Sequence, residues 1–205
     1  INTTREAHVI TIEDPLEYLH QHKKSVVTQR ELYTDTRSYE AALRAALREA
    51  PDVILLGEMR DAETIKAAVT AAETGHLVIS TLHTIGAANT VDRIVDTFPP
   101  AQQRQIRTQL ALALEGVVSQ QLLAAEGGTL IPAFEVMTVT PAVRNMIRES
   151  KAFQLDSVIS TSGALGMITM DQSILELVRG GRVSRDTALR HASNPDWLEK
   201  RLSSL

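Results

Sequence analysis

The sequence predicts an α/β fold, in which a mostly parallel sheet is flanked by helices. Three short apolar runs rich in β-branched residues alternate with longer amphipathic segments, which is typical of βαβ units. The apolar runs are nearly continuous, and this indicates strands that are covered on both faces. Of the 205 residues, 43% are hydrophobic and 22% are charged, as in an ordinary globular protein.

The three apolar runs are the predicted strands of this sheet. Residues 8–12 form the first run, which ends at Asp14-Pro15. Residues 52–57 and 77–81 form the second and third runs. Because helical segments separate them, we expect the three strands to be parallel neighbours or near neighbours in one sheet.

Two helices are predicted between these strands. Ser38 can accept hydrogen bonds from the free N–H groups of a helix over 38–50, and Pro51 ends that helix. Asp61 can cap a second helix in the same way, and the pattern continues to about Thr74.

The rest of the chain is predicted to be mainly helical. Residues 86–98 have helical spacing, and an apolar stripe predicts one long helix over 101–123. Residues 130–137 are expected to form a last strand. From Thr140 onward every pattern is helical, so we divide the chain into a core domain, 1–139, and a C-terminal helical subdomain, 140–205.

Charge and residue content exclude several kinds of partner and site. Lys and Arg total 21 against 25 Asp and Glu. The chain therefore lacks the excess of basic residues that would indicate a nucleic-acid partner. There is no cysteine, which excludes disulfides, thiol catalysis and cysteine zinc sites. No apolar run approaches the roughly 18 residues of a membrane span, so we expect no direct insertion into a membrane.

Each predicted strand is followed at once by residues capable of chemistry. They are Glu13 and Asp14 after the first strand, Glu58, Arg60 and Asp61 after the second, and Thr81, His83 and Thr84 after the third. Parallel strands bring their carboxyl ends to one edge, where ligands of open sheets bind. Carboxylates with a hydroxyl and an imidazole suit a magnesium–phosphate centre. A single carboxylate in such a place can also be a solvated turn or a helix cap, and Asp61 fits a cap.

Three segments together resemble the motifs of the secretion and type IV pilus ATPases. Residues 12–17, Ile-Glu-Asp-Pro-Leu-Glu, are similar to that family's aspartate box. Residues 52–61 resemble its atypical Walker B segment, and residues 74–84 resemble its histidine box. The order and spacing match, and the resemblance covers essentially the whole chain. It implies a RecA-like P-loop NTPase core.

Within that family, the residues favour the branch that retracts pili. Segment 142–149 resembles the retraction motif Ala-Ile-Arg-Asn-Leu-Ile-Arg-Glu, with conservative departures at Val143 and Met146. The matching residues are Ala142, Val143, Arg144, Asn145, Met146, Ile147, Arg148 and Glu149. The cysteine-rich insertion of the assembly branch is missing. An accessory retraction ATPase, a pilus assembly or type II secretion ATPase, and a non-catalytic docking or oligomerisation module remain alternatives.

The resemblance implies roles for the residues at the strand ends. Glu58 would be the Walker B carboxylate that acts on Mg²⁺ or on the attacking water, and Glu13 with Asp14 would supply the second acidic position. Glu58 and Glu13 are therefore the expected catalytic and metal-binding carboxylates. His83 would contact the γ-phosphate.

The remaining residues of the implied site would serve the nucleotide less directly. Thr81 and Asp14 would lie on the nucleotide side, and His76 would support the loop of His83. Arg60 is a candidate relay to a neighbouring subunit, although an exposed, salt-bridged arginine is an equally good interpretation.

The resemblance also implies cofactors, partners and a location. The cofactors would be ATP and Mg²⁺, and the protein would form a homo-oligomer, a hexamer in this family. It would work in the cytoplasm, peripheral to the inner membrane at the base of the pilus machine. Its expected partner there is the inner-membrane platform protein, and the expected function is pilus retraction in twitching motility.

A phosphate-binding loop of the form G-x-x-x-x-G-K-[ST] is absent from the sequence. Gly163-Ala164-Leu165-Gly166 lacks the required Lys-Ser or Lys-Thr. In the family this loop precedes the aspartate box, so we expect the chain to be the C-terminal part of the motor, without the N-terminal strand and P-loop. Alone, it should bind ATP weakly, fail to hydrolyse it and expose an apolar strand edge.

Overall fold

The computed structural model describes residues 1–203, which form two compact units. Unit 1 comprises Ile1–His83 and Ile94–Ala113, and unit 2 comprises Thr84–Arg93 and the chain from Leu114 onward. The chain therefore passes from unit 1 into unit 2 directly after His83.

Unit 1 contains a parallel sheet with the strand order β2-β1-β3-β4. Its strands are β1 (His8–Glu13), β2 (Val26–Glu31), β3 (Val53–Leu56) and β4 (Leu77–Ser80). The three predicted strands and their parallel pairing are confirmed. β2 was not predicted, because only its first two residues are apolar and it forms an outer strand of the sheet.

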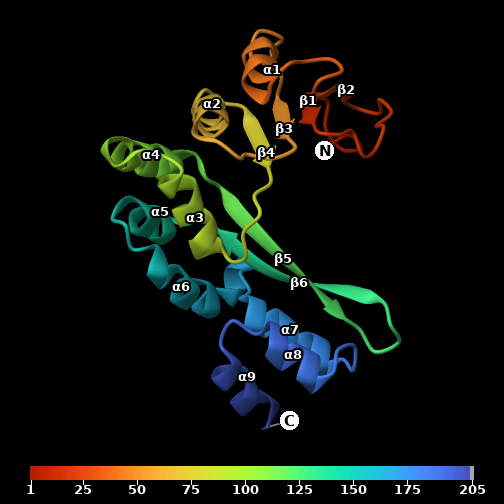
Figure 1. Ribbon diagram of the computed structural model, residues 1–205, viewed down its shortest axis with the longest axis vertical. Coiled ribbons are helices and arrows are strands. Elements are labelled where there is room, and N and C mark those ends of the chain that lie inside the picture. Colours follow the sequence, from red (N-terminus) through yellow and green to blue (C-terminus); the bar gives the residue numbers. More distant parts are fainter. Residues whose placement is uncertain (204–205) are drawn as a thin grey trace. The chain divides into compact units, whose positions relative to one another are not determined.

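Two helices of unit 1 pack against this sheet (Figure 1). Helices α1 (Tyr39–Ala46) and α2 (Ala62–Glu73) begin at the predicted caps. Ser38 accepts a hydrogen bond from Ala41 N at 3.1 Å, and Asp61 accepts one from Thr64 N at 2.8 Å. Apolar side chains of both helices meet those of β1 and β3 in one core, formed chiefly by Ile10, Ile12, Leu43, Ile54, Leu56 and Ala68.

The free edge of β4 carries exposed apolar side chains. β4 is the last strand in the sheet order, and Leu77 and Ile79 are both exposed in it. This matches the exposed apolar edge expected from the sequence. Such an edge offers unpaired backbone groups to another strand.

The prediction of one long helix over 101–123 is wrong beyond Ala113. Helix α3 (Ala87–Asp96) is followed by α4 (Pro100–Ala113), and the chain then forms strand β5 (Gly116–Ala124). β5 pairs with β6 (Leu130–Thr138) in an antiparallel hairpin. Glu115-Gly116 interrupts the helical stripe. In β5 every second residue from Val117 to Leu123 is buried or half-buried and the residues between them are exposed, which is the alternation of a strand.

The hairpin has one covered and one open face. Leu123, Ile131 and Ala133 lie in the core of unit 2, together with side chains from α7 (Met170–Arg179), α8 (Arg185–His191) and α9 (Pro195–Leu202). The opposite face exposes apolar side chains, namely Val118, Leu122, Leu130 and Phe134.

The predicted helical tail is confirmed in unit 2. It contains α5 (Pro141–Arg148), α6 (Leu155–Thr161) and α7 to α9, with short 3₁₀ turns at Ala152–Gln154 and Gly163–Leu165. The hairpin packs with helices α7 to α9, so unit 2 is larger than the predicted subdomain 140–205. The division of the chain into domains at 139/140 stays a prediction. Within the described part of the chain, no helix is both long and apolar enough to cross a bilayer.

Candidate functional site

The carboxyl ends of β1, β3 and β4 lie at one edge of the parallel sheet. β1 ends at Glu13, β3 is followed by Gly57 and Glu58, and β4 is followed by Thr81. Gly57 N donates to Ile12 O at 2.8 Å, and Met59 N donates to Thr81 O at 3.1 Å. These bonds continue the sheet pairing past the strands, so the segments that carry the predicted residues are held beside one another.

Glu58 lies at the centre of this edge. Its side chain is 12% exposed, and each of its oxygens meets a different partner. Arg60 Nη2 lies 2.7 Å from Oε1, and His83 Nε2 lies 3.3 Å from Oε2. The structure thus brings together three of the predicted residues around one carboxylate.

The two partners of Glu58 are themselves open to solvent. The side chains of Arg60 and His83 are 72% and 85% exposed. The hydrogen bond and the charge of Glu58 raise the pKa of Arg60, which therefore keeps its positive charge. An exposed cation can leave a shielded carboxylate and turn to an incoming anion, because breaking an exposed ion pair costs little free energy.

Glu13 and Asp14 supply further negative charge at the same edge. Glu13 Oε1 accepts from Thr11 Oγ1 at 2.6 Å and from Gln29 Nε2 at 3.3 Å, so strands β1 and β2 fix its side chain. Asp14 is exposed and raises the pKa of Arg60 by its charge. Gln29, which comes from the unpredicted strand β2, is a supporting residue that sequence reasoning missed.

Tyr39 is a second residue of this edge that sequence reasoning missed. In the described part of the chain, its buried hydroxyl has no hydrogen-bond partner. Burial raises the pKa of Tyr39, and the charges of Glu58 and Asp14 raise it further. A Cβ at Gly57 would lie 3.0 Å from Tyr39 Oη, so glycine leaves the room that this ring needs. A tyrosine at the start of a helix carries no sequence signal for such a place.

Thr81 and His76 occupy opposite ends of β4. Thr81 Oγ1 donates to Gly57 O at 2.5 Å and ties the two strand ends together. His76 precedes β4, where its Nδ1 lies 3.0 Å from Ala71 O and 3.2 Å from Thr74 Oγ1. With a rise of about 3.3 Å per residue, β4 separates His76 from the edge of Glu58. The structure does not bring His76 to the cluster, and its support of the His83 loop stays a prediction.

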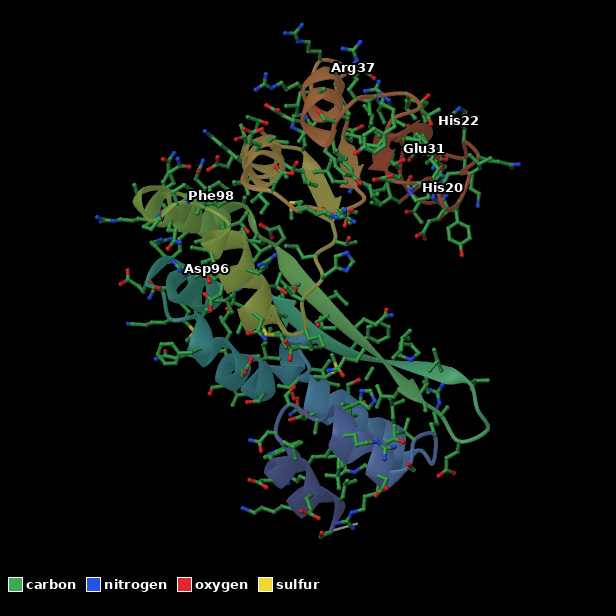
Figure 2. All side chains as sticks on the ribbon, in the orientation of Figure 1. His20, His22, Glu31, Arg37, Asp96 and Phe98 are labelled. Atoms are coloured by element: carbon green, nitrogen blue, oxygen red, sulfur yellow. The ribbon has the colours of Figure 1, made fainter. Side chains whose placement is uncertain are left out.

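Two histidines outside the predicted boxes take part in local hydrogen bonds, one through its ring and one through its backbone. Figure 2 shows His20 and His22 on the loop between β1 and β2. His22 Nδ1 accepts from Val27 N at 3.0 Å, and His20 N donates to Gln29 Oε1 at 2.6 Å. Among residues 1–203, no group of three or more His, Asp or Glu side chains is arranged to hold a metal ion.

The segment that resembles the retraction motif forms helix α5 in unit 2. Thr140 Oγ1 accepts a hydrogen bond from Val143 N at 3.3 Å, and this bond caps the start of the helix. Val143 and Ile147 are buried, whereas Arg148 is exposed. Arg144 Nη2 lies 2.7 Å from Glu115 Oε1. The motif therefore combines an inner apolar side with an outer polar one.

Comparisons with known proteins agree with this arrangement of motifs. The family model described as "Type II/IV secretion system protein" matches residues 1–151. A twitching motility protein of Neisseria gonorrhoeae is 54% identical over 197 residues, which cover 96% of this chain and 53% of the relative. The type IV pilus retraction ATPase PilT of Pseudomonas aeruginosa is 50% identical over 196 residues, covering 96% of this chain and 57% of that protein.

A solved structure shows the same likeness in three dimensions. The crystal structure of the pilus retraction motor PilT with bound ADP matches with a TM-score of 0.90 and 48% identity. The match covers 97% of this chain and 56% of that one. The chain thus spans about half the length of the curated relatives it matches.

Proposed function

Because the chain belongs to the type II/IV secretion system protein family, we propose that it is part of a hexameric ATPase motor that powers type IV pilus retraction. The similarity to a twitching motility protein and to PilT supports this branch of the family. The full-length protein would hydrolyse ATP and couple the reaction to mechanical work.

The observation that carries the proposal is the environment of Glu58. A shielded carboxylate at the carboxyl edge of a parallel sheet is held between an arginine and a histidine. Such a carboxylate can orient an attacking water, or it can bind a metal ion through the water molecules that coordinate the metal. Arg60 and His83 can each turn a cationic or hydrogen-bonding group toward a phosphoryl oxygen, because both side chains are exposed.

The residues at this edge suit ATP with Mg²⁺. Magnesium prefers oxygen ligands and is commonly held by one or two carboxylates together with waters and substrate phosphates. Glu58 and Glu13 would supply those carboxylates, and bound Mg²⁺ would neutralise charge on the phosphates. The sequence contains no glycine-rich phosphate cradle, so we assign that part to other residues of the full-length protein.

Partners and location follow from the same proposal. The protein would form a homo-hexamer in which Arg60 acts as a relay to the neighbouring subunit. It would lie in the cytoplasm at the inner-membrane base of the pilus machine, against the platform protein.

Steady-state ATP hydrolysis by the full-length protein tests the proposed function. We expect the Glu58→Gln variant to lose at least about a hundredfold in kcat, the usual scale for a group that assists proton transfer or orients a nucleophile. Glu49→Gln is the matched control, since Glu49 also pairs with an arginine, Arg30, at 2.6 Å. Unchanged hydrolysis in Glu58→Gln would remove Glu58 from the catalytic centre, and a wild type without hydrolysis would favour a docking module instead.

The direction of action is tested separately at α5. Arg148 is an exposed basic residue in the last turn of that helix, and Arg179 occupies the equivalent place in α7. We expect Arg148→Ala to abolish pilus retraction in cells and to leave ATP hydrolysis within about twofold, as for an exposed residue that lies outside a catalytic centre. Arg179→Ala should retract normally. Loss of surface pili in Arg148→Ala would instead favour the assembly branch, because disabling a motor that only retracts pili leaves assembled pili on the cell.

A further inference from the structure

Tyr39 carries a buried hydroxyl that reaches the carboxyl edge of the parallel sheet in unit 1. It is the first residue of α1, a helix that packs beside β1 and β3 (Figure 1). A Cβ placed on Gly57 would lie 3.0 Å from Tyr39 Oη, and the same point lies 3.4 Å from Glu13 Cα. The hydroxyl is therefore close to the place where β1 and β3 end side by side, next to the chain segments that carry Glu13 and Glu58.

This hydroxyl has no hydrogen-bond partner among residues 1–203, although Tyr39 Oη is itself buried. Taking a hydroxyl out of water without giving it a hydrogen bond costs free energy, and native proteins rarely leave such a group unpaired. An unpaired hydroxyl beside the proposed nucleotide site therefore indicates a partner that comes with the ligand.

The ring of Tyr39 is held in place by the protein itself. It packs against the apolar core that α1 shares with β1 and β3. Ser38 Oγ accepts from Ala41 N at 3.1 Å and so fixes the first turn of the helix that carries the ring. A donor that is already in position loses little conformational entropy when an acceptor arrives.

The groups around this hydroxyl are mostly acceptors of hydrogen bonds. Burial raises the pKa of Tyr39, and the charges of Glu58 and Asp14 raise it further, which shows that both carboxylates lie near the hydroxyl. Ionised carboxylates only accept hydrogen bonds, and phosphate oxygens are strong acceptors too, so a phosphate at this edge needs donors. Arg60 and His83 are exposed donors beside Glu58. Tyr39 adds a neutral donor that is shielded from solvent.

We propose that Tyr39 is a nucleotide-binding residue, whose hydroxyl donates a hydrogen bond to an oxygen of the γ-phosphate of ATP. The inference rests on the proposed function and extends it to the start of α1. Glu58 is assigned to the hydrolysis of that phosphate, so an oxygen of the γ-phosphate would lie at the same edge. Tyr39 then favours ATP over ADP, because only ATP gives its hydroxyl a partner.

Equilibrium binding to the full-length protein tests this role. The two ligands are a non-hydrolysable ATP analogue and ADP, each with Mg²⁺. We expect Tyr39→Phe to weaken binding of the analogue about tenfold, the scale of one hydrogen bond to a charged group. The dissociation constant for ADP should change by less than about twofold, because ADP brings no γ-phosphate. Equal losses for the two ligands, or no loss for the analogue, would overturn the proposal.

Tyr33→Phe is the matched control. Tyr33 lies between β2 and α1 and is 81% exposed, so this variant removes the same hydroxyl from a solvated place in the same unit. We expect both dissociation constants to stay within about twofold of the wild type. A tenfold loss of analogue binding in this variant as well would contradict the assignment to Tyr39.

Steady-state hydrolysis separates the role of Tyr39 from that of Glu58. We expect Tyr39→Phe to raise KM for ATP about tenfold and to keep kcat within about threefold, since an interaction that is equal in the ground state and the transition state affects binding alone. Glu58→Gln should show the opposite pattern. A fall in kcat as large as the rise in KM would contradict a binding role for Tyr39.

Urea unfolding of the full-length protein gives a readout that does not depend on catalysis. Without nucleotide, Tyr39→Phe should be more stable than the wild type, because the unpaired hydroxyl is gone. With Mg²⁺ and the analogue at a saturating concentration this advantage should disappear, since a ligand stabilises a protein according to its affinity. With ADP the advantage should persist. An advantage of equal size with the analogue and without it would show that the hydroxyl gains no partner, and the inference would fail.

The same measurements separate a failure of this inference from a failure of the proposed function. If the wild type neither binds nor hydrolyses ATP, the proposed function fails. If the wild type does both and Tyr39→Phe binds the analogue as tightly as the wild type, the role of Tyr39 fails alone.

Discussion

Glu58 in unit 1 and Glu135 in unit 2 are two shielded carboxylates with opposite kinds of partner. Glu58 meets the exposed side chains of Arg60 and His83, whereas Glu135 meets two backbone amides at helix starts. Side-chain partners can move aside for a ligand, but backbone partners cannot leave without disturbing a helix. The same residue type is thus suited to chemistry in one unit and to anchoring in the other.

The largest expected effect of this difference is on stability. Glu135→Ala leaves two buried N–H groups without acceptors, which should lower the free energy of unfolding by about 2 to 5 kcal/mol. Glu58→Ala should cost less than about 1 kcal/mol, because its partners are solvent-exposed. Urea unfolding of the full-length variants measures both. Equal losses would erase the contrast between the two carboxylates.

Arg60, which pairs with Glu58, provides the next test. Arg60→Gln removes the cation beside Glu58 and should lower kcat for ATP hydrolysis about tenfold in the full-length protein. Arg44→Gln is the control, since Arg44 forms a similar 2.6 Å pair with Glu40 within α1 and is not one of the two side chains that meet Glu58. If both variants hydrolyse ATP at the wild-type rate, Arg60 is only a surface salt bridge.

Tyr39 sharpens the comparison with a smaller, stabilising effect. Its buried hydroxyl is without a partner in the described part of the chain, so Tyr39→Phe should raise the free energy of unfolding by about 1 kcal/mol. Tyr33→Phe should leave it unchanged, because Tyr33 is exposed. Thermal unfolding compares the two. A loss of stability in Tyr39→Phe would mean that the hydroxyl is satisfied after all.

The smallest test concerns the pH dependence of the Glu135 contribution. Burial raises its pKa above the usual 4.5, and the charges of Asp156 and Asp171 add to this, while the amides of Ala87 and Met170 oppose it. When the pKa of a carboxyl group is higher in the folded protein than in the unfolded chain, its contribution to stability is full at pH values below the unfolded pKa. That contribution is lost as the pH rises through the pKa of the folded protein. The stability of the wild type relative to Glu135→Gln should therefore fall with rising pH. A difference that grows with pH would show that the pKa is lowered.

The surroundings of Glu58 were largely predictable from the sequence, whereas its role in hydrolysis stays a prediction. Apolar strands followed by Glu13, Glu58 and His83 identify a parallel sheet edge, because topology alone brings carboxyl ends together. Helix caps such as Ser38 and Asp61 were predictable for a similar reason, since they act within three residues.

The role of Glu135 could not be predicted in the same way. Glu135 acts on amides that lie 48 and 35 residues away in the sequence. It also lies in a hairpin whose first strand was predicted as helix, because the spacing of Ile106 and Leu110 was extended past Gly116. Tyr39 was missed because its place depends on the room left by Gly57.

The most direct test of the account separates ATP binding from ATP cleavage in full-length Glu58→Gln. We predict that the dissociation constant for ATP stays within about threefold of the wild type, while single-turnover cleavage slows by at least about a hundredfold. Cleavage at the wild-type rate, or a loss of ATP binding as large as the loss of cleavage, would contradict the assignment of Glu58 to the hydrolysis step.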